Sequence, residues 1–429
     1  MTAALLGFGA VFALAFLGVP LGFATLLVGV GGFALLRGID PALAMLGQTV
    51  VDASVNYGMS VLPMFVLMGV FVQKADIVDD LYKAANAWVG HLRGGLAQAT
   101  IVSCALFAAI SGSSIATAAT MSRVSIAPMR RLGYSDQLAS GTVASAGVLG
   151  VLIPPSVPLV VFGLLTETDI RKLFIAAVIP GLMLAVLFGL SVWITVRMKP
   201  SHGPSGQRST MAERLGAIKL VWPVMVLFAL VMGGLYGGVF TATESAGMGA
   251  AGALLLGVAR RKMRLAVFVD SLVDATKTTA MLFAIVFGAL TFSNFLTLSG
   301  LTYQLVAWIQ ASAFSPGAVI AAIALIYLAL GCIMEGMGLM LLTAPLFTAV
   351  ALQAGIDPIW FGVFVVMLIE IGMLTPPVGM NLFTVKAVCP EIPLATIVRG
   401  SMPFTAANLV AVGIICAWPA LALAPLGWF

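Results

Sequence analysis

Charge is what this sequence has least of. Asp, Glu, Lys and Arg make up 9% of its 429 residues, whereas 61% belong to the apolar and aromatic set AVILMFWYC. Soluble globular domains carry about 25% charged residues, so the composition excludes a soluble surface and predicts a membrane protein. Apolar runs of about 20 residues, each enough to span a bilayer, recur along the whole chain.

Groups for metal, redox and nucleotide chemistry are also scarce. The chain has two histidines and four cysteines, with no CxxC or HExxH spacing, so we expect no transition-metal site and cysteines that act as small buried apolar residues. It has no G-x-x-x-x-G-K-[ST] motif, so we expect no nucleotide, no organic cofactor and transport powered by an ion gradient. An intramembrane enzyme is the least favoured class, because no nucleophile–base pair is present.

The net charge of +5 comes from short basic patches between apolar runs. Residues 197–219 form a basic loop, and 260–264 form a second patch; the positive-inside rule places both in the cytoplasm, and no nucleic-acid binding is predicted. The apolar stretch over 3–36 predicts a single retained membrane helix, because it is too long for a signal-peptide core. Asp270, Asp274 and Lys277 share one helical face and predict a local ion pair.

Two similar halves flank the 197–219 loop. One offset along the chain takes Pro154-Pro155 to Pro376-Pro377 and Gly150 to Gly372. Such duplication is typical of secondary transporters, although it also builds channels and structural bundles. The sequence therefore predicts an all-α polytopic protein with a first membrane repeat over 1–196, a cytoplasmic loop over 197–219 and a second repeat over 220–429.

Each half contains a helix interrupted by its proline pair. Proline has no N–H and clashes with the carbonyl four residues before it, so we expect broken helices over about 136–163 and 357–388. The carbonyls of Gly150 and Val151 in one half, and of Gly372 and Met373 in the other, should lose their helical partners. Unwound backbone at membrane depth must be buried in protein or line a polar cavity, and transporters use such carbonyls to hold a cation.

A small-residue segment lies upstream of each broken helix. Ser111-Gly112-Ser113-Ser114 and Glu335-Gly336 stand at the same distance before their proline pairs, which predicts re-entrant hairpins over about 96–125 and 315–353 whose tips meet the breaks. An isolated intramembrane serine more often serves helix packing, but the matched spacing favours ligand binding. Sites built from oxygen alone suit Na⁺ better than Mg²⁺ or Ca²⁺. Glu335 and then Glu370 are the strongest ionisable candidates.

The order and spacing of these motifs resemble the large permease subunit of tripartite ATP-independent periplasmic (TRAP) transporters. The resemblance covers nearly the full chain, including Gly150-Val151-Leu152-Ile153-Pro154-Pro155-Ser156 and Thr375-Pro376-Pro377-Val378-Gly379. It implies an ion-transporter-type fold with inverted repeats, a scaffold and a mobile transport domain, working as a Na⁺-coupled elevator in the bacterial inner membrane. It also implies a separate small membrane subunit with four helices and a periplasmic binding protein that delivers a carboxylate-bearing solute, such as a C4-dicarboxylate, sugar acid or sialic acid.

Carried over position by position, the resemblance implies two Na⁺ sites and a substrate site. The Na⁺ ligands would come from Ser111, Gly112, Ser113, Ser114, Gly150, Ile153, Pro154, Gly336, Gly372, Thr375, Pro376 and Gly379. The substrate would contact Ser156, Glu335 and Asn381. Glu335 stands where the family commonly has Asp, which keeps the charge. The alternatives are a self-sufficient sodium–carboxylate symporter of similar fold and, from a different class, a channel or structural bundle.

Overall fold

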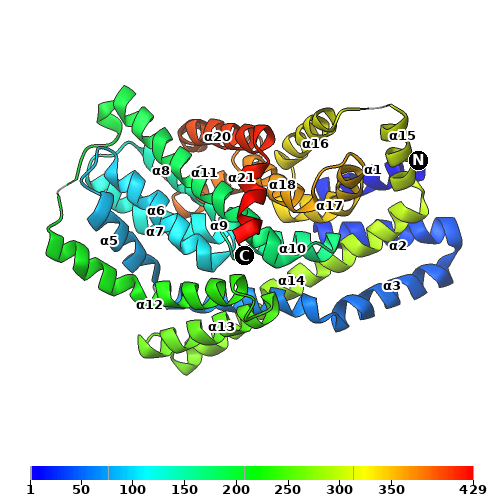
Figure 1. Ribbon diagram of the computed structural model, residues 1–429, viewed down its shortest axis with the longest axis horizontal. Helices are drawn as coiled ribbons and strands as arrows, with labels where there is room; N and C mark the ends of the chain where they lie inside the picture. Colours follow the sequence, from blue (N-terminus) through cyan, green and yellow to red (C-terminus); the bar gives the residue numbers. More distant parts are fainter. Residues whose placement is uncertain (1, 76, 207, 313, 429) are drawn as a thin grey trace.

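The computed structural model describes residues 2–75, 77–206, 208–312 and 314–428, and its regular elements are helices (Figure 1). Up to the linker that follows Met198, the elements are α1 (Thr2–Phe16), α2 (Leu21–Arg37), α3 (Ile39–Val55), η1 (Tyr57–Ser60), α4 (Val61–Lys74), α5 (Ile77–Val89), α6 (Gly95–Ser111), α7 (Ser114–Arg131), α8 (Asp136–Ala146), α9 (Leu149–Leu152), α10 (Val157–Thr166) and α11 (Ile170–Met198).

The remaining elements lie after this linker begins. They are η2 (Pro200–His202), α12 (Met211–Tyr236), α13 (Ala242–Ala259), α14 (Leu265–Leu298), α15 (Leu301–Ala311), α16 (Pro316–Gly331), α17 (Gly336–Gln353), α18 (Pro358–Gly372), α19 (Met380–Val388), α20 (Leu394–Ala417), α21 (Ala420–Leu423) and η3 (Ala424–Trp428).

Many of these helices have the length and composition of membrane spans. Within the described ranges, seven are long and apolar enough to cross a bilayer, and the count becomes eight if α8–α9 and α10, which meet at a bend of 41°, are taken as one span. Several shorter apolar helices, α1, α2, α16 and α18 among them, add to this set. The prediction of an all-helical polytopic protein is therefore confirmed.

The N-terminal apolar stretch differs from the prediction. The expected single helix over 3–36 is two helices, α1 and α2, which meet at a turn over 17–20. Gly18 adopts φ +85°, a left-handed conformation that favours glycine, and Pro20 removes the backbone donor that a continuous helix would need. The hydrophobicity pattern does not indicate this turn, because Leu17 and Val19 are as apolar as their neighbours.

The most buried helices are the two that precede the proline pairs. In α8 every residue from Leu138 to Ala146 is buried, and in α18 every residue from Trp360 to Gly372 is buried. Neither helix has a stripe left for lipid, so both are enclosed by other helices of the protein. Figure 1 shows α5–α8 at one end of the elongated molecule and α1–α3 with α15 at the other.

Small residues allow close helix packing in this fold. A Cβ on Gly141 of α8 would lie 2.1 Å from the carbonyl carbon of Gly400 in α20, so the two backbones are in direct contact. On the other side of the molecule, Gly22 and Gly29 of α2 lie against the backbone of α14 at Ile285 and Phe292. Small residues at helix crossings are typical of membrane proteins, and here they fix α8 and α14 beside the site described below.

The connection between α11 and α12 is held to the protein by its backbone. The predicted loop over 197–219 is shorter than expected, because α12 begins at Met211 with a capping box formed by Thr210 and Glu213. Residues 199–206, the linker strap, lie against two turns of the preceding helices. The amides of Gly94 and Ser135 donate to the carbonyls of Gly203 and His202, at 3.0 and 3.1 Å.

Two further hydrogen bonds complete the attachment of the linker strap. Gly206 N–H donates to the Gly90 carbonyl at 3.1 Å, and the Tyr134 hydroxyl donates to the Pro204 carbonyl at 2.8 Å. Within the strap, burial and then the neighbouring charge of Lys199 lower the pKa of His202 below its ordinary value. The strap is therefore an ordered part of the fold and not a loose tether.

Candidate functional site

Two helix tips point toward the centre of the protein. Helix α6 ends at Ser111 and α7 begins at Ser114, with Gly112 at φ +61° between them. The Ser113 hydroxyl oxygen caps α7 by accepting a hydrogen bond from Ala116 N–H at 3.3 Å. Because glycine tolerates the left-handed conformation and serine is a good cap, the Ser-Gly-Ser-Ser sequence ends one helix and starts the next within two residues.

The second tip joins α16 and α17 and is capped by a charged residue. One carboxylate oxygen of Glu335 accepts from Met337 N–H at 3.1 Å, and the other accepts from Gly338 N–H at 2.8 Å. A carboxylate at a helix N-terminus is stabilised by the unpaired first-turn N–H groups and by the helix dipole. The two tips thus differ in charge: the first is capped by a neutral serine and the second by an anion.

The first tip packs against the first interrupted helix. Helix α9 ends at Leu152 and α10 begins at Val157, so residues 153–156 leave the helix at the proline pair. A Cβ on Gly150 would lie 2.7 Å from Thr117 Oγ1 and 3.0 Å from the Ser113 carbonyl oxygen. Within the described residues, no hydrogen bond reaches the carbonyls of Gly150 or Val151. Gly150, whose carbonyl has no hydrogen-bond donor among the described residues, therefore packs directly against the first turn of α7.

The second tip meets the second interrupted helix in a similar way, with one difference from prediction. Gly331 lies directly against Gly372, and the Val378 amide donates to the Cys332 carbonyl at 3.1 Å. The carbonyls of Gly372 and Met373, expected to be free, accept from Thr375 N–H at 3.1 Å and Asn381 N–H at 3.2 Å. That expectation was wrong, because Thr375 closes a turn onto Gly372, and the chain after the proline pair folds back so that the Asn381 amide reaches Met373.

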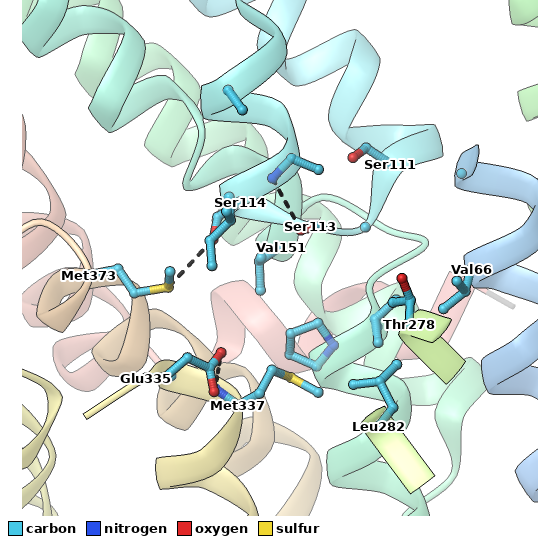
Figure 2. Close-up of a pocket in the computed structure, with 18 of the residues that line it drawn as sticks. Val66, Ser111, Ser113, Ser114, Val151, Thr278, Leu282, Glu335, Met337 and Met373 are labelled. Atoms are coloured by element: carbon cyan, nitrogen blue, oxygen red, sulfur yellow. Dashed lines mark hydrogen bonds between the residues drawn. The ribbon is translucent and has the colours of Figure 1, made fainter. Parts of the chain in front are cut away.

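A cavity of about 420 Å³ lies between the tips (Figure 2). This size is within the range of small-molecule sites. Ser111, Gly112, Ser113 and Ser114 of the first tip and Glu335 and Gly336 of the second line it. Figure 2 shows Ser111, Ser113 and Ser114 in the upper part of the view and Glu335 with Met337 below them. The cavity therefore joins the two segments that the sequence singled out, although they lie far apart along the chain.

The structure does not bring every predicted residue to this cavity. The break residues, namely Gly150, Ile153, Pro154, Gly372, Thr375, Pro376 and Gly379, lie outside its described lining. Ser156 is buried and caps α10 by accepting from Leu159 N–H at 3.3 Å. Asn381 is fully buried and donates to the Ala144 carbonyl at 3.2 Å. Of the three predicted substrate contacts, Glu335 is the one that lines the cavity.

Glu370 is the second carboxylate in the cavity lining. It is 2% exposed, and its Oε2 atom has no hydrogen-bond partner among the described residues. The Glu335 carboxylate lies close enough to act on it electrostatically. A buried ionised carboxyl without a partner is costly, so this group is stable here as the neutral acid or with a cation beside it.

Two walls of the cavity could not be found from sequence motifs. Val66, Val70 and Gln73 come from α4, and Thr278, Met281 and Leu282 come from α14. Gln73 and Thr278 are polar residues in apolar helices. Apart from these two, neither segment contains a sequence feature that indicates a site. The neighbouring ion pair was also wrongly predicted: Asp274 pairs with Lys74 of α4, at 3.1 Å. The partner lies across the helix interface and not along one helical face.

An Arg-centred ion network ties the first tip helix to the second half of the chain. Arg130, near the end of α7, makes a bidentate contact with Asp136 at 2.5 and 2.8 Å. Its third hydrogen bond goes to Glu391, in the turn before α20, at 2.7 Å. Bidentate arginine–carboxylate pairs are geometrically specific. The network therefore fixes α7, α8 and the α19–α20 turn relative to one another.

Long apolar helices, with a cavity between two helix tips that pack against two interrupted helices, are typical of a polytopic helical membrane transporter. Residues 8–421 match the family model described as "Tripartite ATP-independent periplasmic transporter, DctM component". The chain belongs to this family, and it is a large permease subunit of the TRAP transporters and not an enzyme. The resemblance drawn from the motifs is confirmed.

Curated relatives agree with this assignment. The C4-dicarboxylate TRAP transporter large permease protein DctM of Pseudomonas aeruginosa is 36% identical over 400 residues, covering 93% of each chain. The sialic acid TRAP transporter large permease protein SiaM of Vibrio cholerae is 31% identical over 412 residues, covering 96% of this chain and 95% of the relative. The crystal structure of the YdaH transporter of Alcanivorax borkumensis shares the fold, with a TM-score of 0.65, 15% identity and 90% coverage of each chain.

Proposed function

We propose that this subunit catalyses Na⁺-coupled uptake of a carboxylate-bearing solute across the bacterial inner membrane. The observation that carries the proposal is that the carbonyls of Gly150 and Val151 have no hydrogen-bond donor among the described residues. Gly150 packs against the start of α7, and Val151 lines the same cavity as the serines of the first tip. Buried backbone oxygens that lack a donor need a cation or water. An all-oxygen set of carbonyls and hydroxyls suits Na⁺.

The two Na⁺ sites of the proposal are formed by a tip and the break behind it. The first uses the Ser111–Ser114 tip with Gly150, Ile153 and Pro154. The second uses Gly336 with Gly372, Thr375, Pro376 and Gly379, a weaker case because two of its carbonyls accept backbone hydrogen bonds. We expect the first site to hold its ion more tightly, since fewer existing bonds must be broken there.

Transport would proceed by an elevator motion of the tips and broken helices as one body. Arg130 supports this view, because it links α7 to α8 and to the turn at Glu391 at distances of 2.5–2.8 Å. Two inverted repeats would then supply equivalent tip-and-break units on opposite sides of the solute. The scaffold would be formed by the long helices outside these units, with the linker strap on the cytoplasmic side.

The proposed assembly has three components. A small membrane subunit with four helices would join the scaffold in the bilayer, and a periplasmic binding protein would deliver the solute. The solute itself is not fixed by the family, because relatives are named for C4-dicarboxylates, sialic acid and ectoine. Selection by the binding protein would account for this range.

Reconstitution into proteoliposomes tests the proposal. The large permease, its small partner and the cognate binding protein would be assayed for uptake of radiolabelled organic acids, with and without an inward Na⁺ gradient. We expect uptake to need both the gradient and the binding protein, and to fall in Ser113→Ala and Thr375→Ala. Uptake by the large permease alone would replace the proposal with an independent symporter, and Na⁺-independent flux would replace it with a channel.

A further inference from the structure

Asn381 lies outside the described lining of the cavity, although it is polar and fully buried. It belongs to the first turn of α19. Polar side chains in the interior of a protein are nearly always hydrogen-bonded, because an unpaired buried group is costly. The hydrogen bonds of Asn381, one from its backbone and one from its side chain, therefore indicate its role.

The backbone of Asn381 closes the second break, which comprises residues 373–379 between α18 and α19. Its N–H donates to the Met373 carbonyl at 3.2 Å, so the two ends of the break are joined. This segment contains three proposed ligands of the second Na⁺ site, namely Thr375, Pro376 and Gly379. The position of Asn381 thus sets the shape of the segment that would hold the second ion.

The side chain of Asn381 reaches the first half of the chain. Its Nδ2 group donates to the Ala144 carbonyl of α8 at 3.2 Å. Helix α8 ends two residues later, and the Val148 amide, which would bind Ala144 in a continuous helix, donates to the Ser145 carbonyl at 3.1 Å instead. The carbonyls in the last turn of a helix lack helical partners. Asn381 therefore caps the end of α8 from the opposite half of the chain.

The end of α8 leads directly to the first proposed Na⁺ site. A Cβ on Gly147 would lie 3.0 Å from the Ser114 carbonyl oxygen in the first turn of α7. A Cβ on Gly150, one of the proposed ligands, would lie at the same distance from the Ser113 carbonyl oxygen. The two backbones are thus closely packed, and such packing transmits small displacements. A shift of the end of α8 would therefore move the first tip and its ion site.

Asn381 also has an unpaired group that packing alone would not require. Its Oδ1 atom has no hydrogen-bond partner among the described residues. The opposite orientation of the amide would place Oδ1 against the Ala144 carbonyl, and two acceptors repel, so Nδ2 is the group that must face α8. A leucine of similar shape would avoid the cost of the unpaired oxygen. The bond that Nδ2 makes accounts for an asparagine at this position.

We propose that Asn381 is a positioning residue that couples the two Na⁺ sites, because it joins the end of α8 to the second break. This inference rests on the proposed function and adds the relation between its two ion sites. An ion at either site orders one end of the link, so less conformational entropy is lost when the other ion binds. The coupling is therefore positive, and by linkage each ion strengthens the binding of the other by the same factor.

Equilibrium binding of radioactive Na⁺ tests the coupling without solute or binding protein. The purified complex of large and small subunits in detergent would be titrated at constant ionic strength, and the Hill coefficient taken from the occupancy. Two independent sites, of equal or unequal affinity, cannot give a Hill coefficient above about 1. For the native protein we expect a value of at least about 1.3, as for coupling of roughly tenfold.

Two matched variants assign the coupling to Asn381. Asn381→Leu keeps the approximate volume but removes the Nδ2 donor, so the Hill coefficient should fall to about 1 or below while both ions still bind. Asn408→Leu is the control, because Asn408 of α20 is also fully buried but its side-chain atoms have no hydrogen-bond partner among the described residues. It should keep the native Hill coefficient. If Asn381→Leu fails to fold, Asn381→Ala removes the same donor and replaces it in the test.

A Hill coefficient of about 1 or below in the native protein would overturn the inference. An unchanged value in the Asn381 variant would also overturn it, and so would an equal loss in Asn408→Leu, which would indicate a general effect of replacing a buried asparagine. The proposed function fails separately, through Na⁺-independent flux in the uptake assay. Na⁺-dependent uptake together with independent ion binding would retain the transporter and reject the coupling.

Discussion

The Ser114 hydroxyl donates a hydrogen bond to the sulfur of Met373 at 3.4 Å, which joins the first tip directly to the second interrupted helix. Both side chains are buried. We expect Met373→Leu, which keeps the volume but removes the acceptor, to lower the free energy of unfolding by roughly 1 kcal/mol. Chemical unfolding in mixed micelles measures this loss.

A double-mutant cycle gives the control for that contact. Ser114→Ala alone and Met373→Leu alone should each be destabilising, and the double variant should lose less than the sum, because both changes remove one interaction. Strict additivity would mean that the contact has no energetic role. The tips would then be joined by apolar packing alone.

Ser113 has two proposed roles, as the cap of α7 and as a ligand of the first Na⁺ site. A second serine that only caps a helix serves as the control. Because Ser113 serves both roles, Ser113→Ala should destabilise by about 1 kcal/mol and raise the Na⁺ concentration for half-maximal uptake by roughly tenfold, the effect of about 1.4 kcal/mol of binding. Ser315 caps α16 in the same way, by accepting from Ala318 N–H at 3.2 Å, but lies outside the site. Ser315→Ala should lose stability without changing the Na⁺ dependence. A similar Na⁺ shift in both variants would show that cap loss, and not ion binding, is being measured.

Of the helix crossings described above, the crossing of α8 and α20 should be the least tolerant of added side-chain atoms. A Cβ on Gly400 would lie 1.9 Å from the Gln137 carbonyl oxygen, whereas a Cβ on Gly413 of the same helix meets nothing within 4 Å. We expect Gly400→Ala to cost about 1–3 kcal/mol or to prevent folding, and Gly413→Ala to be neutral or slightly stabilising. Expression level and melting temperature in detergent distinguish the two. Equal tolerance at both positions would contradict the close approach of the helices.

Much of the site was predictable because it depends on residues with strong local effects. The proline pairs, the Ser-Gly-Ser-Ser tip and Glu335 change the backbone wherever they stand, so their breaks and caps follow from the sequence. The cavity walls at Val66 and Met281 did not follow, because these residues are ordinary in apolar helices and only the tertiary packing brings them together. The amides that bond the carbonyls of Gly372 and Met373 depend on the path of the chain after the break.

The histidine of the linker strap gives the protein a predictable response to acid. Because burial and Lys199 lower the pKa of His202 in the folded state, the unfolded chain takes up a proton more readily. Its contribution to stability is complete above about pH 6.5, the ordinary value for histidine, and is lost as the pH falls below that value toward the lower pKa of the folded state. The melting temperature should decline over this range in the native protein.

Substitutions at the same place check the origin of the acid response. His202→Gln should flatten this part of the pH profile, and Lys199→Gln should reduce its slope, because the second cause of the shift is removed. A melting temperature that rises on acidification through the same range would contradict the assignment, since it would require a raised pKa.

The attachment of the linker strap has a consequence for how this segment can change in evolution. Three of its four bonds join one backbone group to another, at Gly203, His202 and Gly206, and the fourth uses its Pro204 carbonyl. Such bonds depend on spacing and not on side-chain identity. Away from Gly203 and Gly206, where an added Cβ would lie 2.8 Å from Val196 Cγ2 and 2.6 Å from the Gly90 carbonyl oxygen, the segment should accept many amino-acid replacements between relatives. It should resist insertions and deletions throughout. A single added residue would shift every later carbonyl and amide out of register with the turns at Gly90 and Gly94.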